Sequence, residues 1–185
     1  MTTELPIYIE PTPNPTAFKF ILTQDVKRGG KVGFKSQTEC GEVPLAHELF
    51  DVEGVKDIHF FENVITITFS GYAKLSETIE KVKSIIRAKL PEHNPEFKSG
   101  PDENERRAAL TPDLQKIEAI LDETIRPGLR GDGGDLEVLT LDGNQLFVRY
   151  QGACGSCPSS TTGTLQAIEG ILRDRYDPHI EVITI

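Results

Sequence analysis

The second half of the chain centres on the stretch Gly152-Ala153-Cys154-Gly155-Ser156-Cys157-Pro158-Ser159. Its two cysteines are three positions apart, a spacing at which two thiols can bind one soft metal centre or join as a disulfide. The glycines have no Cβ, so the backbone can turn tightly and approach a bulky centre closely. Pro158 suits the first position of a helix, which predicts Cys157 at the N-cap, where the helix dipole favours a thiolate. We therefore interpret the stretch as a prepared thiolate site.

One chain supplies half of the ligands that such a centre needs. Zinc and ordinary iron–sulfur clusters each take four protein ligands, whereas the motif offers Cys154 and Cys157. Cys40 is more than a hundred residues away, and His179 has no second histidine at ligand spacing. Two chains related by a two-fold axis would supply four thiolates, enough for one [4Fe–4S] cluster. We therefore expect a homodimer with the cluster at its interface.

Two other uses of the cysteine pair remain open. It could be a thiol–disulfide redox module, although no thioredoxin-like βαβ pattern surrounds it. It could also be half of a zinc site in a zinc-bridged interaction adaptor. Cys40 is expected to be an ordinary buried or half-exposed thiol, with a sensor or third-ligand role as the alternative. Asp132-Gly133-Gly134-Asp135 offers too few oxygens for a calcium loop and is interpreted as a tight turn beside the site.

Composition and charge exclude several classes of protein. The net charge of −9 argues against binding to nucleic acid or to an anionic membrane. No apolar run approaches the length of a membrane span, and the first residues lack a secretory or transit pattern, which predicts a cytoplasmic location. We find no Ser-His-Asp set, paired catalytic carboxylates or nucleotide loop, so we do not expect an enzyme. The basic pairs Lys27-Arg28 and Arg106-Arg107 are expected to be solvated charges.

The 185 residues suit two small domains of α+β class. Residues 91–110 are rich in proline and charge, which predicts a flexible linker between domains at 1–90 and 111–185. In the first domain the patterns predict strands at 17–22 and 31–35, a turn at 27–30, helices at 44–52 and 75–90, and a hairpin of 55–61 with 64–69. In the second domain they predict the order α-β-β-α-β: a helix from Thr111 ended by Pro127-Gly128, a hairpin of 136–141 with 145–150, the cysteine loop, a helix around 165–172 and a strand at 180–185.

Both halves resemble the Nfu family. The second half matches the NifU C-terminal-like domain through Arg126-Pro127-x-Leu129-x-x-Asp132-Gly133-Gly134-Asp135 and Gly152-x-Cys154-x-x-Cys157-Pro158-x-Ser160-x-x-Gly163-Thr164-Leu165. The first half is similar to the Nfu N-terminal domain through Glu10-Pro11-Thr12-Pro13-Asn14-Pro15, Pro44-Leu45-Ala46, Leu49-Phe50 and Glu53-Gly54-Val55. Together these motifs cover almost the whole chain.

The resemblance implies a function and its residues. It makes Cys154 and Cys157 the iron ligands of a [4Fe–4S] cluster held between two protomers, with a [2Fe–2S] form as the alternative. It implies a scaffold that receives clusters from upstream donors and passes them to apo iron–sulfur client proteins. The amino-terminal domain would then recognise clients or donors, because it offers no candidate ligand other than Cys40.

Overall fold

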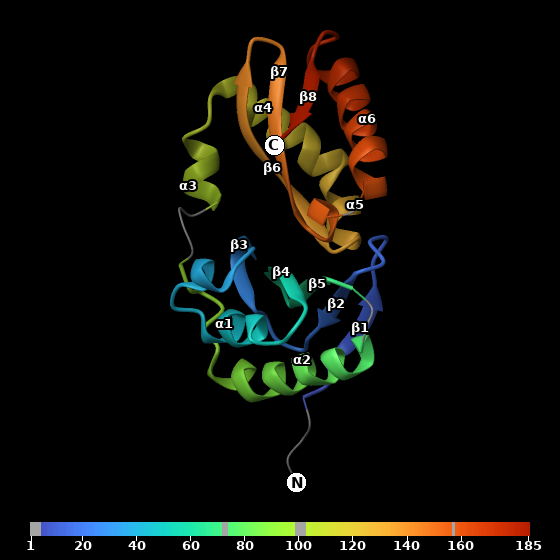
Figure 1. The fold of residues 1–185 in the computed structure, drawn as a ribbon. Helices are drawn as coiled ribbons and strands as arrows, with labels where there is room; N and C mark the ends of the chain where they lie inside the picture. The colour runs from blue at the N-terminus through green and yellow to red at the C-terminus, as the bar shows by residue number, and fades with distance from the viewer. Residues whose placement is uncertain (1–4, 72–73, 99–102, 157) are drawn as a thin grey trace. The chain divides into compact units, whose positions relative to one another are not determined.

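The computed structural model describes residues 5–71, 74–98, 103–156 and 158–185 (Figure 1). The chain divides into two compact units, residues 1–103 and 104–185, and each unit has a hydrophobic core of its own. Both units combine a β-sheet with helices that pack against it. The predicted α+β class with two small domains is therefore confirmed.

Within its described residues, the first unit is built on a five-stranded antiparallel sheet in the order β1-β2-β5-β4-β3. The strands are β1 (Tyr8–Pro11), β2 (Ala17–Ile21), β3 (Lys27–Phe34), β4 (Val55–Glu62) and β5 (Val64–Phe69). The helical elements are η1 (Gln37–Cys40), α1 (Pro44–Phe50), α2 (Leu75–Lys89) and η2 (Leu90–Glu92).

The core of the first unit lies between this sheet and its two longer helices. Alternation along the strands places Phe60 of β4 and Ile65 of β5, which are partners in register, on the helical side. Helix α2 contributes Val82 and Ile86, four positions apart on one buried face, and α1 contributes Leu49. In Figure 1 both helices lie on the same side of the sheet. Each such fully buried side chain stabilises the fold by about 1.5–3 kcal/mol relative to exposure.

The turn predicted at residues 27–30 is wrong, because these residues form the first half of β3. The pairing of β3 with β4 shifts register between Lys27 and Lys31, which marks a β-bulge or a similar irregularity. Gly29 and Gly30 fall inside this shift. Residues 27–30, whose composition resembles that of a turn, are thus part of an irregular edge strand.

The start of the predicted linker, 91–110, packs onto the first unit. The ring of His93 stands edge-on to that of Phe60, with 6.0 Å between the ring centroids. The Phe97 ring lies 5.5 Å from His93, and the Lys27 ammonium lies 4.9 Å from the Phe97 centroid. The expectation that this segment has little to bury is therefore wrong for residues up to 97, because two rings among its prolines and charges reach the core.

The second unit, within its described residues, has a three-stranded sheet in the order β6-β7-β8. Strands β6 and β7 are antiparallel, and β7 and β8 are parallel. The elements are α3 (Glu103–Ala108), α4 (Pro112–Thr124), α5 (Arg126–Gly131), β6 (Gly134–Asp142), β7 (Gln145–Gly152), η3 (Ala153–Ser156), α6 (Pro158–Arg175) and β8 (Glu181–Thr184). The predicted order α-β-β-α-β is present, and α3, α5 and η3 are additional. In the described part of the chain, no helix combines the length and the apolarity needed to cross a membrane.

The first long helix of this unit begins as predicted and ends differently. The Thr111 hydroxyl caps α4 by accepting a hydrogen bond from the Leu114 backbone N–H at 3.4 Å. Helix α4 then ends at Thr124, and Pro127 lies in the first turn of a new helix, α5. Proline is tolerated in a first helical turn, where its missing N–H would have no partner in the helix. Pro127 therefore helps to start a helix rather than to stop one.

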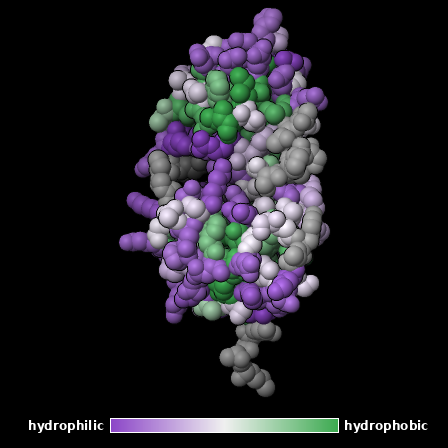
Figure 2. All heavy atoms as spheres, viewed as in Figure 1, coloured by the Kyte–Doolittle hydropathy of each residue, from purple (hydrophilic) through white to green (hydrophobic). Residues whose placement is uncertain are grey.

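The two faces of the second sheet differ in their packing. Val182 of β8 and Leu146 of β7 are partners in register and belong to the core under the helices. Their neighbours Ile183 and Phe147 are also paired but point to the opposite face, where both are partly exposed. Figure 2 shows apolar residues gathered over the strands of this unit.

Candidate metal centre

Cys154 lies at the end of the β6–β7 hairpin, in the short helix η3 that follows β7. Its side chain belongs to the core of the second unit, and the residue is 4% exposed. Helix α6 begins at Pro158, as the sequence predicts. The second cysteine of the motif, Cys157, lies outside the described residues, and its predicted role as the N-cap of α6 lies outside them too.

A close approach of two chain segments shapes the wall beside Cys154. Gly134, the first residue of β6, is paired with Gly152, the last residue of β7. A Cβ atom on Gly134 would lie 2.5 Å from the Cys154 Sγ and 2.8 Å from the carbonyl oxygen of Gln151. Gly152 has φ of +63°, a left-handed conformation that turns the chain into η3. The thiol is therefore packed directly against the backbone of β6, at a position that admits no side chain.

Tyr150 brings a polar atom into the same core. The residue is 6% exposed, and its hydroxyl oxygen is buried without a hydrogen-bond partner in the described structure. Burial, together with the smaller effect of the negative charge of Cys154, raises the pKa of Tyr150 to about 12. A buried donor without a partner is uncommon in a folded protein and calls for an explanation. Here the charge of the Cys154 sulfur, one of the two ligands that the sequence predicts, acts on this hydroxyl.

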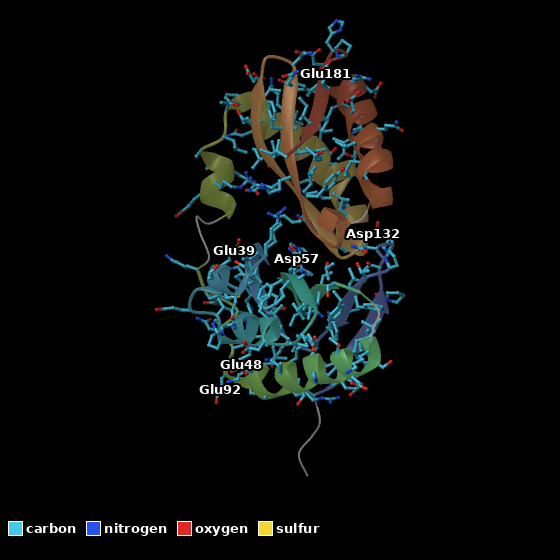
Figure 3. All side chains as sticks on the ribbon, in the orientation of Figure 1. Glu39, Glu48, Asp57, Glu92, Asp132 and Glu181 are labelled. Carbon is cyan, nitrogen blue, oxygen red and sulfur yellow. The ribbon has the colours of Figure 1, made fainter. Side chains whose placement is uncertain are left out.

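Asp135, which follows Gly134 in β6, takes part in a buried ion pair. Asp135 and Arg126 are both 0% exposed, and Arg126 Nε lies 3.3 Å from Asp135 Oδ1. Asp135 Oδ1 also accepts a hydrogen bond from the Leu136 backbone N–H at 2.6 Å, and Arg130 Nε donates to Asp135 Oδ2 at 3.1 Å. The start of β6 is thus fixed to α5 by buried charges. Asp132, by contrast, is exposed in the turn between these elements (Figure 3).

The ion network extends from Arg126 into α4 and α3. Arg126 Nη1 lies 2.6 Å from Glu118 Oε2 and 2.7 Å from Asp122 Oδ1. Arg107 bonds both carboxylate oxygens of Asp122. Arg106 pairs with Glu118 at 3.2 Å. The expectation that Arg106 and Arg107 are solvated charges is therefore wrong, because they compensate carboxylates that pack beside the core.

Sequence reasoning missed this network, although one signal was available. Glu118, Asp122 and Arg126 follow one another at intervals of four, so a continuous helical path places them on one face. Hydrogen bonds from Arg107 and Arg126 and their positive charges outweigh the effect of burial on Asp122 and lower its pKa to about 2. The carboxylate is therefore ionised at neutral pH.

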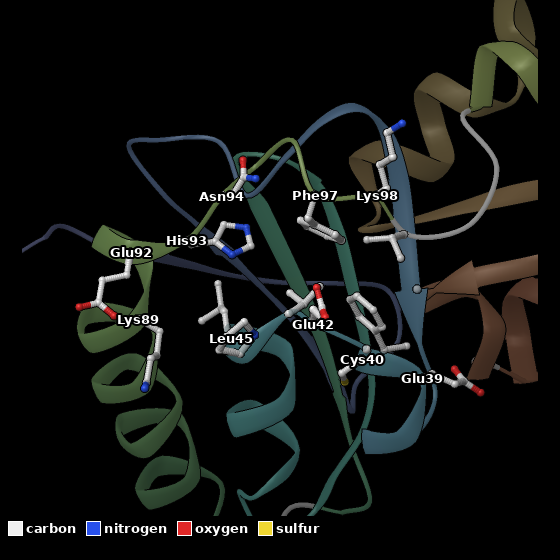
Figure 4. Close-up of a pocket in the computed structure, with 16 residues that line it drawn as sticks. Glu39, Cys40, Glu42, Leu45, Lys89, Glu92, His93, Asn94, Phe97 and Lys98 are labelled. Carbon is white, nitrogen blue, oxygen red and sulfur yellow. The ribbon is translucent and has the colours of Figure 1, made fainter.

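Cys40 lies at a different kind of site. It lines a groove of about 980 Å³ in the first unit, between the edge of β3 and the residues that follow α2 (Figure 4). Its thiol is buried and lies 3.6 Å from the Ser36 carbonyl oxygen, to which it donates. Burial raises the pKa of Cys40 to about 11, and the charge of Glu39 acts in the same direction. These features match the expected buried thiol and disfavour a thiolate ligand.

The described residues of one chain do not complete a metal site. Among them, no group of three or more His, Cys, Asp or Glu side chains is arranged to hold a metal ion. The acidic turn around Asp132 accordingly forms no such group with its neighbours in the described structure. Of the predicted pair, Cys154 lies within the described residues, packed against the backbone of Gly134 in the core that also contains Tyr150.

Each of the two units matches the model of a known protein family. Residues 117–183 match the model of the NifU-like domain, and residues 7–93 match that of the scaffold protein Nfu/NifU N-terminal domain. The two matches thus define a NifU-related scaffold protein in two domains.

Two relatives that match almost the whole chain carry names of the same family. The human protein named NFU1 iron-sulfur cluster scaffold homolog, mitochondrial, is 30% identical over an alignment of 184 residues that covers 95% of this chain and 69% of that protein. The Drosophila sechellia protein of the same name is 30% identical over an alignment of 180 residues that covers 96% of this chain and 63% of that protein. The chain belongs to the Nfu family of iron–sulfur cluster scaffold proteins. It spans about two thirds of the length of these relatives.

Solved structures are also similar to parts of the chain. The solution structure of a NifU-like protein from Saccharomyces cerevisiae has a TM-score of 0.47 and 19% sequence identity. The match covers 55% of this chain and 92% of that one.

Proposed function

We propose that the protein holds a [4Fe–4S] cluster between two protomers and passes it to apo iron–sulfur client proteins. Cys154 and Cys157 of each protomer are the iron ligands, which gives the four thiolates that such a cluster takes. Upstream donors supply the cluster, and the [2Fe–2S] form is the alternative cargo. The observation that carries the proposal is a buried Cys154 thiol in a glycine cradle, in a chain whose described residues offer no complete metal site.

The residues around Cys154 fit this cargo. Gly134 leaves backbone rather than a side chain beside the thiol, so no Cβ crowds the sulfur at that wall. The buried Tyr150 hydroxyl is a donor that a sulfur acceptor would satisfy. The Arg126–Asp135 pair fixes the first residues of β6, against which Cys154 packs. We therefore expect the chain to supply the thiolates, the Gly134 backbone beside them and the Arg126–Asp135 ion pair that holds that backbone in place.

A shared site suits delivery rather than storage. Each protomer contributes half of the ligands, so separation of the protomers removes two thiolates at once. Client thiolates can then displace Cys154 and Cys157 by ligand exchange, one bond at a time. No step requires an acid or a base from the protein, and we assign no catalytic residue.

The first unit is proposed to recognise clients or donors. Cys40 is buried there with a raised pKa, and the described residues of the unit contain no metal-ligand group. The groove of Figure 4 offers an apolar wall with charged side chains, among them Glu42, Glu92 and Lys98, along it. Such a mixture is typical of surfaces that bind another protein.

Anaerobic reconstitution with iron and sulfide tests the proposal. We expect a coloured dimer by native mass spectrometry with about four irons and four sulfides per two chains. Cys154→Ser and Cys157→Ser should each lose the cluster and the cluster-dependent dimer. Cys40→Ser is the matched control and should keep both. A full cluster in either motif variant, or in an isolated monomer, would overturn the proposal.

The two alternatives give different results in the same preparation. A thiol–disulfide module would reduce disulfides as a metal-free monomer and show a two-electron potential. A zinc adaptor would contain stoichiometric zinc after purification without air. The cytoplasmic location stays a prediction from the sequence.

A further inference from the structure

The groove of the first unit in Figure 4 has an apolar interior. The buried residues that line it are Phe34, Cys40, Val43 and Leu45. The one polar atom among their side chains, the Cys40 thiol, already donates to the Ser36 carbonyl oxygen. The volume of about 980 Å³ leaves room for several side chains. The interior therefore suits apolar side chains rather than a small polar molecule, which would need polar groups to fix its orientation.

One wall of the groove is formed by residues 93–98, which are bonded to β3 and to the residue before it. The ring Nε2 of His93 lies 2.7 Å from the Val26 carbonyl oxygen. The Arg28 backbone N–H donates to the Pro95 carbonyl oxygen at 2.9 Å. A wall that is already held in place needs little ordering when a partner binds, so less free energy is lost on association.

The charged residues of the groove are mostly acidic. Its lining contains three carboxylates and two ammonium groups: Glu39, Glu42, Glu92, Lys89 and Lys98. Lys89 is already paired, because its Nζ lies 2.6 Å from Oε1 of Glu48, which is not part of the lining. The three carboxylate residues are exposed, and Figure 4 shows Glu92 and Glu39 toward opposite ends of the groove with Glu42 between them. Burial lowers the pKa of His93, so its ring adds no positive charge at pH 7.

We propose that this groove binds a short segment of a client or donor protein in which apolar side chains alternate with lysine or arginine. The apolar side chains enter the groove, and the cationic groups face the carboxylates along it. Complementary charge of this kind selects the partner and speeds its association. The inference rests on the proposed function, in which the first unit recognises clients or donors, and it specifies the chemistry that the first unit recognises.

The test uses the metal-free full chain and a fluorescein-labelled peptide of six residues in which leucine and lysine alternate. Fluorescence anisotropy gives the dissociation constant. The lysine peptide should bind about tenfold more tightly than peptides with glutamate in place of lysine or serine in place of leucine. Its affinity should fall as sodium chloride is added, because the carboxylates are exposed. Amide NMR shifts on binding should be confined to residues 32–45 and 89–98.

Charge reversal at the groove tests the site itself. Glu42→Lys combined with Glu92→Lys should make the glutamate peptide the tighter ligand. Glu53→Lys combined with Glu77→Lys is the matched control, because it changes the net charge equally at exposed residues outside the groove. The control variant should retain the preference for the lysine peptide.

Several results would overturn the inference: equal binding of the two charged peptides, the same reversal in the control variant, or amide shifts in the second unit. A metal-free dimer that the lysine peptide separates would make a second copy of the chain the occupant, and a client or donor segment would then be the wrong choice. Failure of cluster reconstitution is a separate outcome. It would overturn the proposed function and the identity of the partner as a client or donor, whereas a loaded protein that binds no lysine peptide would overturn this inference alone.

Discussion

Arg126 and Asp135 face each other across the junction of α5 and β6, with Nε and Oδ1 3.3 Å apart and neither residue exposed to solvent. Asp135 is the neighbour of Gly134, whose backbone forms the wall beside Cys154. The pair therefore links the helices of the second unit to its cysteine loop. A buried pair of this kind matters most when one member is removed, since the other is left as an uncompensated charge.

Arg126→Met should destabilise the second unit by about 3–5 kcal/mol. The substitution removes the fully buried cation that Asp135 and Glu118 share, and leaves each with more exposed arginines only, Arg130 for Asp135 and Arg106 and Arg107 for Glu118. Hydrogen exchange of the β6 amides, measured against urea, reports this unit directly. Lys116→Met is the control, because its pair with Asp113 is exposed and 3.9 Å long, and it should change stability by less than about 1 kcal/mol. Equal effects of the two substitutions would contradict the assignment.

Gly134→Ala should disturb the cysteine loop. Its new Cβ would meet the Cys154 Sγ at 2.5 Å and the Gln151 backbone at 2.8 Å, so the loop must shift. We expect reduced cluster uptake in reconstitution and a lower midpoint of unfolding. Gly170→Ala is the matched control, because nothing lies within 4 Å of its added Cβ in α6. That change should raise stability by about 0.5–1 kcal/mol and leave uptake unchanged.

Stability should fall as the pH is lowered toward the pKa of Asp122. Its pKa is about 2 in the folded protein, below the ordinary value of 3.8, because its bonds to Arg107 and Arg126 outweigh its burial. The unfolded chain therefore binds the proton first, and the contribution present above pH 4 is lost as the pH falls toward 2. Urea midpoints between pH 5 and pH 2.5 measure this loss. Asp122→Asn should be less stable at pH 5 and show a shallower decline. Parallel curves would exclude Asp122 as the cause.

Cys40 should resist alkylation at neutral pH in the folded protein. Its thiol is buried and its pKa is raised to about 11, so the reactive thiolate is scarce. Mass spectrometry of peptides after brief iodoacetamide treatment gives the modified fraction, and urea-unfolded protein gives the full reaction. Labelling of native Cys40 as fast as in urea would show that the groove exposes it.

Periodic apolar patterns predicted most of the fold. Val82 and Ile86 repeat at helical spacing and form the buried face of α2. The hairpin of β6 and β7 follows from alternation around Asp142-Gly143-Asn144. Elements whose stability depends on distant partners were missed. Helix α3 has no apolar stripe, and its described contacts with the rest of the unit include the ion pairs of Arg106 and Arg107.

For the candidate site, sequence spacing identified the cysteines but not their support. The motif predicted a helix at Pro158 and a left-handed turn at its glycines, and both are present, the turn at Gly152. The close backbone approach to Cys154 is made instead by Gly134. Spacing along the chain could not show that Gly134, twenty positions before Cys154, provides that approach, because it depends on the pairing of β6 with β7. Nor could it show that the Tyr150 hydroxyl lacks a partner, since satisfaction of a polar group is a property of packing.

The parallel pairing of β7 with β8 has a consequence during synthesis. Strand β8 follows the cysteine loop and α6 in the chain, yet it joins the sheet beside the strand that precedes them. The three-stranded sheet is therefore complete only after the chain has passed through the cysteine loop and α6. A chain truncated before β8 would leave β7 as an unpaired edge strand, open to association with other strands.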